Sequence, residues 1–496
     1  MTRKQLRPNI VVNLIRTLTI TLLSFISFPF ASTALGDVAM GQYSWANTFV
    51  YFFLIIAKLG IPTVAIRECS KVKDDPVLLA KKIQTYFFLQ LITTLISYAA
   101  MFIIVFGLND TVVDLTSRPL VMLLSLNFLV GVFSFEWVFI TLEKHFYIAL
   151  RSIFTGSIGL LLVIMFVRND RHLFTYAFLA MFTTFATVII NLFMLRQEKI
   201  SLIPKDKIVL KGIFKPLIII FLITLIVTAY NQADSLLLGY VDESKSLVGS
   251  YAVGVRGIEI VITIITSLSA VFIPRATMAL KNNNIKEFNY INNYSTNITF
   301  FIALPAVTTM IILAPQIVGF IVTNDIYWSP TAIENAVWAI MILSALMFTY
   351  SLGDNIYQQV LIPLGKEKIY FYTMIGGLIL NLGLSITSVF TIFKDYPLIG
   401  VSLSTMVSDI LVLGLLIFLT RKHVYKNIFN NNNLKIIIAT AIIGILTYFI
   451  APRLNIGDPL MLIISAILIA GSIYIIILAI LKEDIVRETF SKSKQD

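Results

Sequence analysis

The chain has 496 residues, of which 58% are hydrophobic and only 13% are charged, whereas an ordinary soluble domain is about 25% charged. This composition excludes a soluble globular protein and indicates an integral membrane protein along the whole chain. The single cysteine, Cys69, cannot form an internal disulfide, and the three histidines are far apart in sequence, without a zinc or nucleophile motif. No glycine-rich phosphate loop occurs either, and we expect no metal ion and no other cofactor.

Runs of about 20 apolar residues, the length of a helix that crosses a bilayer, predict an all-α polytopic membrane protein with about fourteen transmembrane helices. The first run follows Arg3, Lys4 and Arg7 as a secretory signal would, but we expect it to remain as the first of many spans. The predicted spans are 9–31, 41–66, 83–107, 119–140, 146–167, 173–195, 213–237, 248–273, 298–319, 332–352, 369–393, 397–420, 434–451 and 458–481.

The lysine and arginine residues predict the orientation of these spans. Of the 38 Lys and Arg residues, 29 fall in segments expected inside or at the inner ends of spans, six fall in outer loops and three lie deeper within spans. Cytoplasmic loops of membrane proteins are rich in basic residues, so both termini are expected in the cytoplasm and the protein in the cell (cytoplasmic) membrane. The net charge of +11 then orients the chain and meets anionic lipids. It requires no nucleic-acid partner.

The two halves of the chain share a pattern that indicates an internal repeat. Each half runs from the outer end of one helix, through a Gly-x-Tyr start of a second helix, to a proline near its cytoplasmic end. Chance similarity between apolar helices is the alternative. Parallel repeats place a substrate site at their interface, so we expect two pseudo-twofold-related six-helix lobes and two additional C-terminal helices. The matching segments are Leu35-Gly36, Gly41-Gln42-Tyr43-Ser44 and Ile61-Pro62 in the first half, and Leu238-Gly239, Gly249-Ser250-Tyr251-Ala252 and Ile273-Pro274 in the second.

The repeat divides the chain into five predicted regions. The basic segment between the halves is expected to lie on the membrane surface as a short amphipathic helix. The asparagine runs at 282–284 and 430–433 read as plain cytoplasmic loops. The regions are an N-terminal lobe with helices 1–6 at 1–195, a basic cytoplasmic linker at 196–212, a C-terminal lobe with helices 7–12 at 213–422, helices 13 and 14 at 434–481, and a cytoplasmic tail at 482–496.

Three cations interrupt the apolar spans. Arg16 and Lys58 lie in the inner half of the first and second spans, and Arg256 lies in the outer half of the eighth, one turn before Glu259. A charge at membrane depth is costly and usually faces a protein interior or a wet cavity. The alternatives are that Lys58 extends to the membrane surface and that Arg256 forms a purely structural pair with Glu259. We predict that the polar faces of these spans line one central cavity.

Acidic and amide side chains within the spans provide further candidates. Asp409 lies near the centre of the twelfth span with no cation nearby in sequence, and a buried carboxylate without a partner tends to take up a proton. Asp409 is therefore a candidate ion-coupling residue, as are Glu259 and Asp234. Glu136 reads as an interfacial residue at the inner end of the fourth span. The candidates for other polar contacts in the cavity are Asn13, Asn47, Asn231 and Asn381.

Three local sequences, in their order and spacing, resemble the polysaccharide flippases of the multidrug/oligosaccharidyl-lipid/polysaccharide exporter superfamily. The resemblance covers nearly the whole chain. It implies a V-shaped, two-lobed transporter, not an enzyme, that moves undecaprenyl-pyrophosphate-linked oligosaccharide repeats from the inner to the outer leaflet for capsule, O-antigen or exopolysaccharide assembly. It also implies contact with membrane lipids and with polysaccharide polymerase machinery, and we expect a monomer. The sequences are LGIPTVAIRE at Leu59–Glu68, NQADSLLLGY at Asn231–Tyr240, and GSYAVGVR from Gly249 followed by FIPRA at Phe272–Ala276.

The resemblance also implies roles for the intramembrane cations. Related lipid II flippases carry basic residues on the first, second and eighth helices of a cationic cavity, which extends a pyrophosphate-binding role to Arg16, Lys58 and Arg256 only. A flippase for lipid II or a teichoic-type precursor is an alternative, as is a cation-coupled multidrug antiporter of the same fold. The drug-exporting branch has twelve helices and an aspartate in the first, and this chain departs from both. No predicted outer loop is long enough for the catalytic domain of a polymerase or ligase. The sugar and the driving ion, whether proton, sodium or the membrane potential alone, stay open.

Overall fold

The computed structural model describes residues 3–107, 113–198, 213–323, 325–454 and 456–487. Within these ranges every regular element is a helix, and thirteen helical stretches are long and apolar enough to cross a membrane. The predicted all-α polytopic architecture is therefore confirmed. Most of the predicted basic linker and the end of the predicted tail lie outside the described residues.

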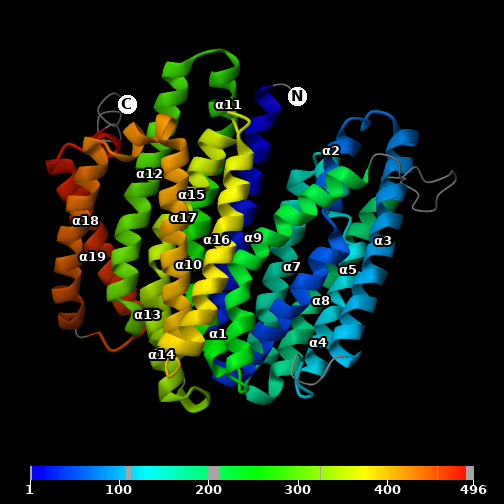
Figure 1. Cartoon of the computed structure of the whole chain (residues 1–496), viewed down its shortest axis with the longest axis horizontal. Coiled ribbons are helices and arrows are strands. Elements are labelled where there is room, and N and C mark those ends of the chain that lie inside the picture. Colours follow the sequence, from blue (N-terminus) through cyan, green and yellow to red (C-terminus); the bar gives the residue numbers. More distant parts are fainter. Residues whose placement is uncertain (1–2, 108–112, 199–212, 324, 455, 488–496) are drawn as a thin grey trace. The chain divides into compact units, whose positions relative to one another are not determined.

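The first membrane-spanning stretch is one long helix with a break. α1 (Arg3–Lys58) has 56 residues, about twice the length that one bilayer crossing needs. At Gly36 the backbone has φ 77° and ψ 178°, a conformation that residues with a Cβ atom rarely adopt. In Figure 1 the blue ribbon runs from the N-terminus to the α1 label and then back toward α2 (Ile61–Ser70). The break gives the first two predicted spans, so thirteen stretches agree with about fourteen spans.

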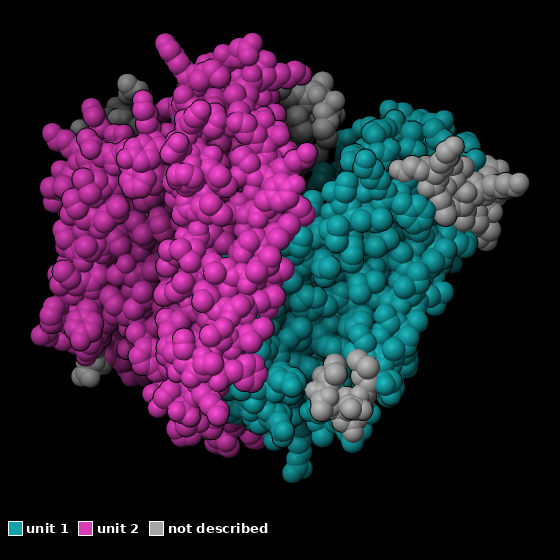
Figure 2. All heavy atoms as spheres, viewed as in Figure 1, with its two compact units in different colours: residues 1–249 teal, residues 250–496 magenta. Residues whose placement is uncertain are grey.

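Residues 1–249 form one compact unit, which Figure 2 colours teal and which we call unit 1. α7 packs along α1, and α9, which the repeat assigns to the second lobe, also packs against α1. At one end a core of apolar side chains, including the fully buried Phe135 and Phe139, joins α2, α3 and α6. After α2 its helices are α3 (Pro76–Gly107), α4 (Arg118–Ser125), α5 (Asn127–Val132), α6 (Glu136–Thr141), α7 (His145–Phe166), α8 (Leu173–Gln197) and α9 (Phe214–Val241), with a 3₁₀ turn at Asp170–His172.

Residues 250–496 form the second compact unit, magenta in Figure 2 and called unit 2 below. Its helices are α10 (Ser246–Ala270, which begins just before the boundary), α11 (Ile273–Lys281), α12 (Ile285–Ile312), α13 (Ala314–Ile321), α14 (Pro330–Leu343), α15 (Ala345–Ile356), α16 (Glu367–Thr387), α17 (Pro397–Ile428), α18 (Asn431–Ile450) and α19 (Pro459–Ile480). Helices α18 and α19, the two additional spans, pack against α12 and α13. Two π-helical turns, Tyr357–Leu361 and Ser388–Ile392, extend α15 and α16, and 3₁₀ turns lie at Asp325–Tyr327 and Ala451–Arg453.

Two glycines that the sequence repeat aligns, Gly41 and Gly249, pack against each other in unit 1. A Cβ atom added to Gly41 would lie 1.7 Å from the carbonyl oxygen of Lys245 and 2.9 Å from the nitrogen of Gly249. A Cβ atom added to Gly249 would lie 2.1 Å from the carbonyl oxygen of Asp37 and 3.2 Å from the nitrogen of Gly41. Only glycine allows backbones to approach this closely. The contact joins the two glycines that the proposed repeat aligns.

Polar side chains surround this glycine contact. Ser246 donates a hydrogen bond of 2.8 Å to Asp37, which is only 6% exposed. Lys245, in the turn between α9 and α10, is buried: its ammonium donates to the carbonyl of Gly239 and lies 5.1 Å from the ring of Trp45. Charged groups are rarely buried unless they are paired in this way. The junction between α9 and α10 is thus held to α1 by both backbone packing and charge.

The asparagine run at 430–433 was expected to be a plain loop, and this is wrong. Asn430 caps α18, because its side chain accepts a 2.7 Å hydrogen bond from the backbone N–H of Asn433. Its amide nitrogen also donates to Asn293 and Asn297 of α12, at 3.1 Å and 3.0 Å. The asparagines therefore start α18 and fasten it to α12.

Candidate functional site

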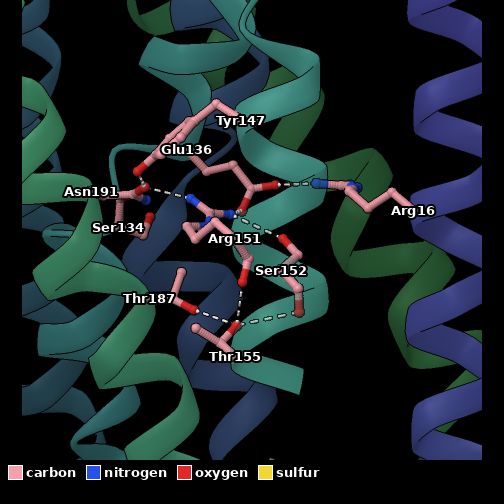
Figure 3. A network of polar contacts seen from close by, with 9 residues as sticks. All are labelled: Arg16, Ser134, Glu136, Tyr147, Arg151, Ser152, Thr155, Thr187 and Asn191. Carbon is pink, nitrogen blue, oxygen red and sulfur yellow. Dashed lines mark hydrogen bonds and ion pairs between the residues drawn. The ribbon is translucent and has the colours of Figure 1, made fainter. Parts of the chain in front are cut away.

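A charge network in unit 1 joins three helices (Figure 3). Arg16 of α1 donates from Nη1 to Oε1 of Glu136 at 3.0 Å, and Arg151 of α7 donates from Nη2 to Oε2 of the same carboxylate at 3.0 Å. The exposed fraction of the side chain is 22% for Arg16, 37% for Glu136 and 2% for Arg151. One carboxylate thus connects a partly exposed arginine to a fully enclosed one.

The position of Glu136 is fixed by a break in the fourth predicted span. The span is present, but it consists of α4, α5 and α6, and Phe135 before α6 has φ 46°. A left-handed backbone is uncommon for a bulky residue and is held here because Phe135 and the following Trp137 and Val138 are buried in the core. Glu136 is the first residue of α6, between these anchored neighbours. The backbone of Glu136 is therefore fixed beside the two arginines.

Arg151 is enclosed by hydrogen-bond acceptors. Its Nη1 donates to Oδ1 of Asn191 at 2.5 Å, and its Nη2 also reaches Oγ of Ser152 at 3.3 Å. The hydroxyl of Tyr147 donates to the same Asn191 oxygen at 2.8 Å, and Asn191 donates in turn to the carbonyl of Ser134. A buried charge is tolerated only when it is paired and hydrogen-bonded. The network satisfies this condition and ties α7 to α8.

Lys58 is the third cation that acts on Glu136. It ends α1, is partly buried, and interacts electrostatically with Glu136. Arg16, Arg151 and Lys58 therefore act on a single carboxylate, which leaves a surplus of positive charge. Arg16 also has a buried Nε with no hydrogen-bond partner among the described residues. Such a surplus, close to a partly exposed arginine, attracts an anionic group.

The other predicted polar residues of unit 1 are distributed between its surface and its interior. Asn13, Asn47 and Asn231 are exposed, on α1 and α9. Asp234 on α9 is only 2% exposed. No hydrogen bond joins these four residues to the Arg16 network in the described chain. Their predicted roles stay predictions.

Unit 2 holds the remaining predicted site residues. Arg256 donates from Nη1 to Oε2 of Glu259 at 2.6 Å, and the two side chains are 51% and 49% exposed. Asp409 of α17 is only 4% exposed and accepts a hydrogen bond from the hydroxyl of Thr349 on α15. Asn381 of α16, fully buried, donates to Thr405 of α17 at 3.1 Å, one turn from Asp409. The structure thus brings Asn381 and Asp409 into one polar region. The Arg256–Glu259 pair lies on α10, more than a hundred residues earlier in the sequence.

Sequence reasoning missed two residues of these clusters. Arg151 was not among the predicted intramembrane cations, but it is buried within α7. The signal that could have found it is its place inside the predicted fifth span. Asp354 was also missed: Nε2 of Gln358 donates to it at 2.5 Å, at the start of the π-helical turn after α15.

Ion pairs of a different kind lie between the spans. Nζ of Lys73 donates to Glu143 at 2.6 Å, which raises the pKa of Lys73, and Lys144 pairs with Glu198. All four side chains are between 27% and 37% exposed. Exposed pairs contribute little to stability, so these serve as a contrast to Arg151. Among the described residues no group of His, Cys, Asp and Glu is arranged to hold a metal ion.

Comparisons with known proteins place the chain among membrane transporters. The family model described as "Polysaccharide biosynthesis protein" matches residues 6–280, more than half of the chain, and the MatE model matches residues 216–387. No curated protein matches the chain by sequence.

Solved structures share the fold over most of the chain. A lipid II flippase, MurJ, in an inward closed conformation has 17% identity and a TM-score of 0.68, with 95% of this chain and 99% of that chain covered. A multidrug resistance MATE transporter in an inward-facing conformation has 13% identity and a TM-score of 0.60, with 85% and 99% covered. A transporter of the MOP superfamily from Pyrococcus furiosus, described as having a binding pocket of reverse polarity, has 15% identity and a TM-score of 0.56. It covers 85% of this chain and 96% of that chain.

Proposed function

The chain belongs to the polysaccharide biosynthesis family within the multidrug/oligosaccharidyl-lipid/polysaccharide exporter superfamily, and on that premise we propose that it flips undecaprenyl-pyrophosphate-linked oligosaccharide repeat units from the inner to the outer leaflet. The product serves cell-surface polysaccharide synthesis. The observation that carries the proposal is the surplus of positive charge at Arg16, Lys58 and Arg151 around the single carboxylate of Glu136.

The chemistry of the substrate explains why such a site is needed. A pyrophosphate with attached sugars cannot cross hydrocarbon without partners that replace its hydration. Arginine offers a planar fork of donors that fits phosphate oxygens, and lysine adds a compact charge. Arg16 and Lys58 take these roles in unit 1, and Arg256 takes the same role in unit 2. The prenyl tail needs no such site because it is apolar and stays in the hydrocarbon core of the bilayer.

Glu136 acts as the counter-ion of Arg16 when no substrate is bound. A phosphate oxygen takes the place of Oε1 of Glu136 on the Arg16 guanidinium, while Arg151 continues to hold Oε2. Arg151 is thus a positioning residue: it touches Glu136 and not the substrate. Glu259 serves Arg256 in the same way. Each arginine then alternates between an internal carboxylate and the substrate. Arg16 and Arg256 therefore keep a counter-ion when the carrier returns without substrate.

The transport cycle proceeds by alternating access, during which the pyrophosphate contacts the cations Arg16, Lys58 and Arg256. Moving about two negative charges outward gains roughly 5 kcal/mol per 100 mV of inside-negative potential. The potential therefore favours export, and a proton or cation on Asp409, Glu259 or Asp234 assists the return. The protein acts as a monomer in the cytoplasmic membrane, with both termini in the cytoplasm, and delivers its product to the polymerase machinery.

Flipping of a labelled lipid-linked oligosaccharide in vesicles that contain the purified protein tests the proposal. Replacing both Arg16 and Lys58 by Gln is expected to slow flipping by about a hundredfold or more, because each charge-assisted hydrogen bond contributes about 1.5–3 kcal/mol. Lys71→Gln with Lys73→Gln is the matched control, since it removes the same charge from exposed side chains of unit 1. Flipping at the unmodified rate in the Arg16 and Lys58 variant would refute the role of these cations.

The MatE match supports one second candidate, a cation-coupled multidrug antiporter of the same fold. The surplus of positive charge in unit 1 repels the cationic drugs that such an antiporter exports. Uptake of a cationic dye by vesicles separates the two functions. Dye uptake that lipid-linked oligosaccharide does not inhibit would favour the antiporter. Flipping of lipid II in preference to oligosaccharide repeat units would favour a precursor flippase.

A further inference from the structure

A pocket of about 280 Å³ lies in unit 2 where the start of α16 meets the last third of α17. The charge count places this end of both helices at the cytoplasmic face. One side of the pocket is basic and the other is apolar. We call it the basic pocket, and its lining includes Lys366, Arg421, Lys422, His423, Phe418 and Leu419.

The backbone turn before α16 fixes the position of Lys366. The N–H of Lys366 donates to the carbonyl of Leu361 at 2.9 Å, and the N–H of Gly365 donates to Ile362 at 3.0 Å. Gly365 has φ 65°, the left-handed conformation that glycine adopts without strain at the end of a helix. The turn therefore closes the π-helical segment Tyr357–Leu361 and directs the chain so that Lys366 joins the cations of α17.

The basic side of the pocket has no internal counter-charge. His423 interacts electrostatically with both Lys366 and Lys422, so these groups are close enough to repel one another when charged. Lys366, Arg421 and Lys422 make no ion pair and no side-chain hydrogen bond with any residue in the described ranges. Converging like charges favour binding of an anion that relieves the repulsion. This differs from the Arg16 network, in which Glu136 already supplies the counter-charge.

The other side of the pocket carries exposed apolar surface. Phe418 and Leu419 are 60% and 50% exposed, and Tyr425, two turns beyond Phe418, is 58% exposed. The guanidinium carbon of Arg421 lies 5.0 Å from the centre of the Phe418 ring. Aromatic and basic residues side by side are typical of the level of the lipid headgroups. A soluble anion makes no apolar contact with this surface, whereas the glycerol and acyl groups of a lipid pack against it.

We propose that the basic pocket binds the phosphate headgroup of an anionic glycerophospholipid of the inner leaflet. The phosphate oxygens contact Lys366, Arg421 and Lys422, and the glycerol and first methylene groups lie on Phe418 and Leu419. The site involves none of the residues given a role in transport. The proposed function and this lipid site can therefore fail separately.

Native mass spectrometry of the full-length protein, titrated with dioleoyl phosphatidylglycerol, tests the proposal. The protein is expected to retain phosphatidylglycerol in preference to phosphatidylcholine. Lys366→Gln with Lys422→Gln is expected to weaken phosphatidylglycerol binding by about 25-fold, since each basic residue near an anionic lipid contributes about a factor of five. Both side chains are exposed, so the variant is expected to keep its unfolding temperature.

The control variant is Lys281→Gln with Lys286→Gln, which removes two exposed charges near the turn between α11 and α12. It is expected to bind phosphatidylglycerol as the unmodified protein does. Equal loss in the control, or full binding in the Lys366 and Lys422 variant, would overturn the site. Displacement of the lipid by millimolar inorganic phosphate would overturn the lipid as its ligand and assign the pocket to a free phosphate.

Discussion

Arg16 and Arg151 donate to the two oxygens of one carboxylate, that of Glu136, at the same distance of 3.0 Å. The two arginines differ in their surroundings. The side chain of Arg151 is 2% exposed and is also held by Asn191, whereas that of Arg16 is 22% exposed. A shared carboxylate thus separates a structural cation from one that is free to change partners.

Substitution of the two arginines is expected to give opposite results. Arg151→Gln removes one partner of a buried pair, which costs about 3–5 kcal/mol of stability. Arg16→Gln is expected to cost less than about 1 kcal/mol of stability, as for other partly exposed pairs, but to slow flipping by about tenfold or more. Denaturant unfolding in detergent and the vesicle assay measure the two effects. An Arg16→Gln variant as unstable as Arg151→Gln would make Arg16 a structural residue.

Glu136→Gln is expected to tighten binding of the anionic substrate and to slow turnover. The carboxylate that competes for Arg16 is removed, so the dissociation constant for a short-chain probe, farnesyl pyrophosphate, is expected to fall several-fold. Return of the empty carrier then lacks its counter-ion, so the flipping rate falls. Titration calorimetry and the vesicle assay follow both quantities.

The double variant isolates the competition from other effects of Glu136. With Arg16→Gln in place, Glu136→Gln is expected to have no further effect on the affinity for farnesyl pyrophosphate. Glu198→Gln, at the exposed pair with Lys144, serves as the control and is expected to bind like the unmodified protein. An equal gain in affinity with and without Arg16 would refute the competition.

The glycine contact predicts a position-specific effect of a single methyl group. Gly41→Ala and Gly249→Ala place a Cβ atom within about 2 Å of a backbone carbonyl, and overpacking of this kind costs about 1–3 kcal/mol or more. Gly376→Ala and Gly471→Ala, where no atom lies within 4 Å of the added Cβ, are expected to be neutral or to stabilise their helices by up to about 1 kcal/mol. Thermal unfolding compares the four variants. Equal stability of all four would contradict the close contact.

Asp409→Asn is expected to remove the dependence of flipping on pH. Asparagine keeps the shape of the side chain and an oxygen that accepts from Thr349, so the fold is preserved while the titratable group is lost. The vesicle assay at several pH values measures the effect. Asp458→Asn, which retains the cap at the start of α19, is the control. Unchanged rate and pH dependence in Asp409→Asn would exclude its coupling role.

The membrane architecture was predictable from the sequence because the bilayer sets the length of an apolar helix. The predicted spans at 434–451 and 458–481 correspond to α18 and α19 within a few residues. Gly41 and Gly249 were marked in the sequence because close backbone contact leaves only glycine at these positions. These features depend on local composition, which a single sequence displays directly.

The charge network could not be predicted in the same way because it depends on distant partners. Arg151 is 15 residues from Glu136 and 40 residues from Asn191. The sequence around Arg151 contains no pattern that predicts either contact. The break at Phe135, which places Glu136, requires a left-handed backbone in a residue that gives no local sign of it. The contact of Asn430 with α12 likewise joins residues more than a hundred positions apart.

The burial of Arg151 has a consequence for how the chain enters the membrane during synthesis. An arginine at the centre of a membrane-spanning helix opposes insertion by about 2.5–3.5 kcal/mol, and Arg151, in the first turns of α7, opposes it by less. α6, which begins with Glu136, leaves the ribosome just before α7, so the carboxylate is in place when the arginine arrives. The two segments are therefore expected to insert as one helical hairpin. Loss of Glu136 would then reduce the amount of correctly inserted protein before it affects any step of transport.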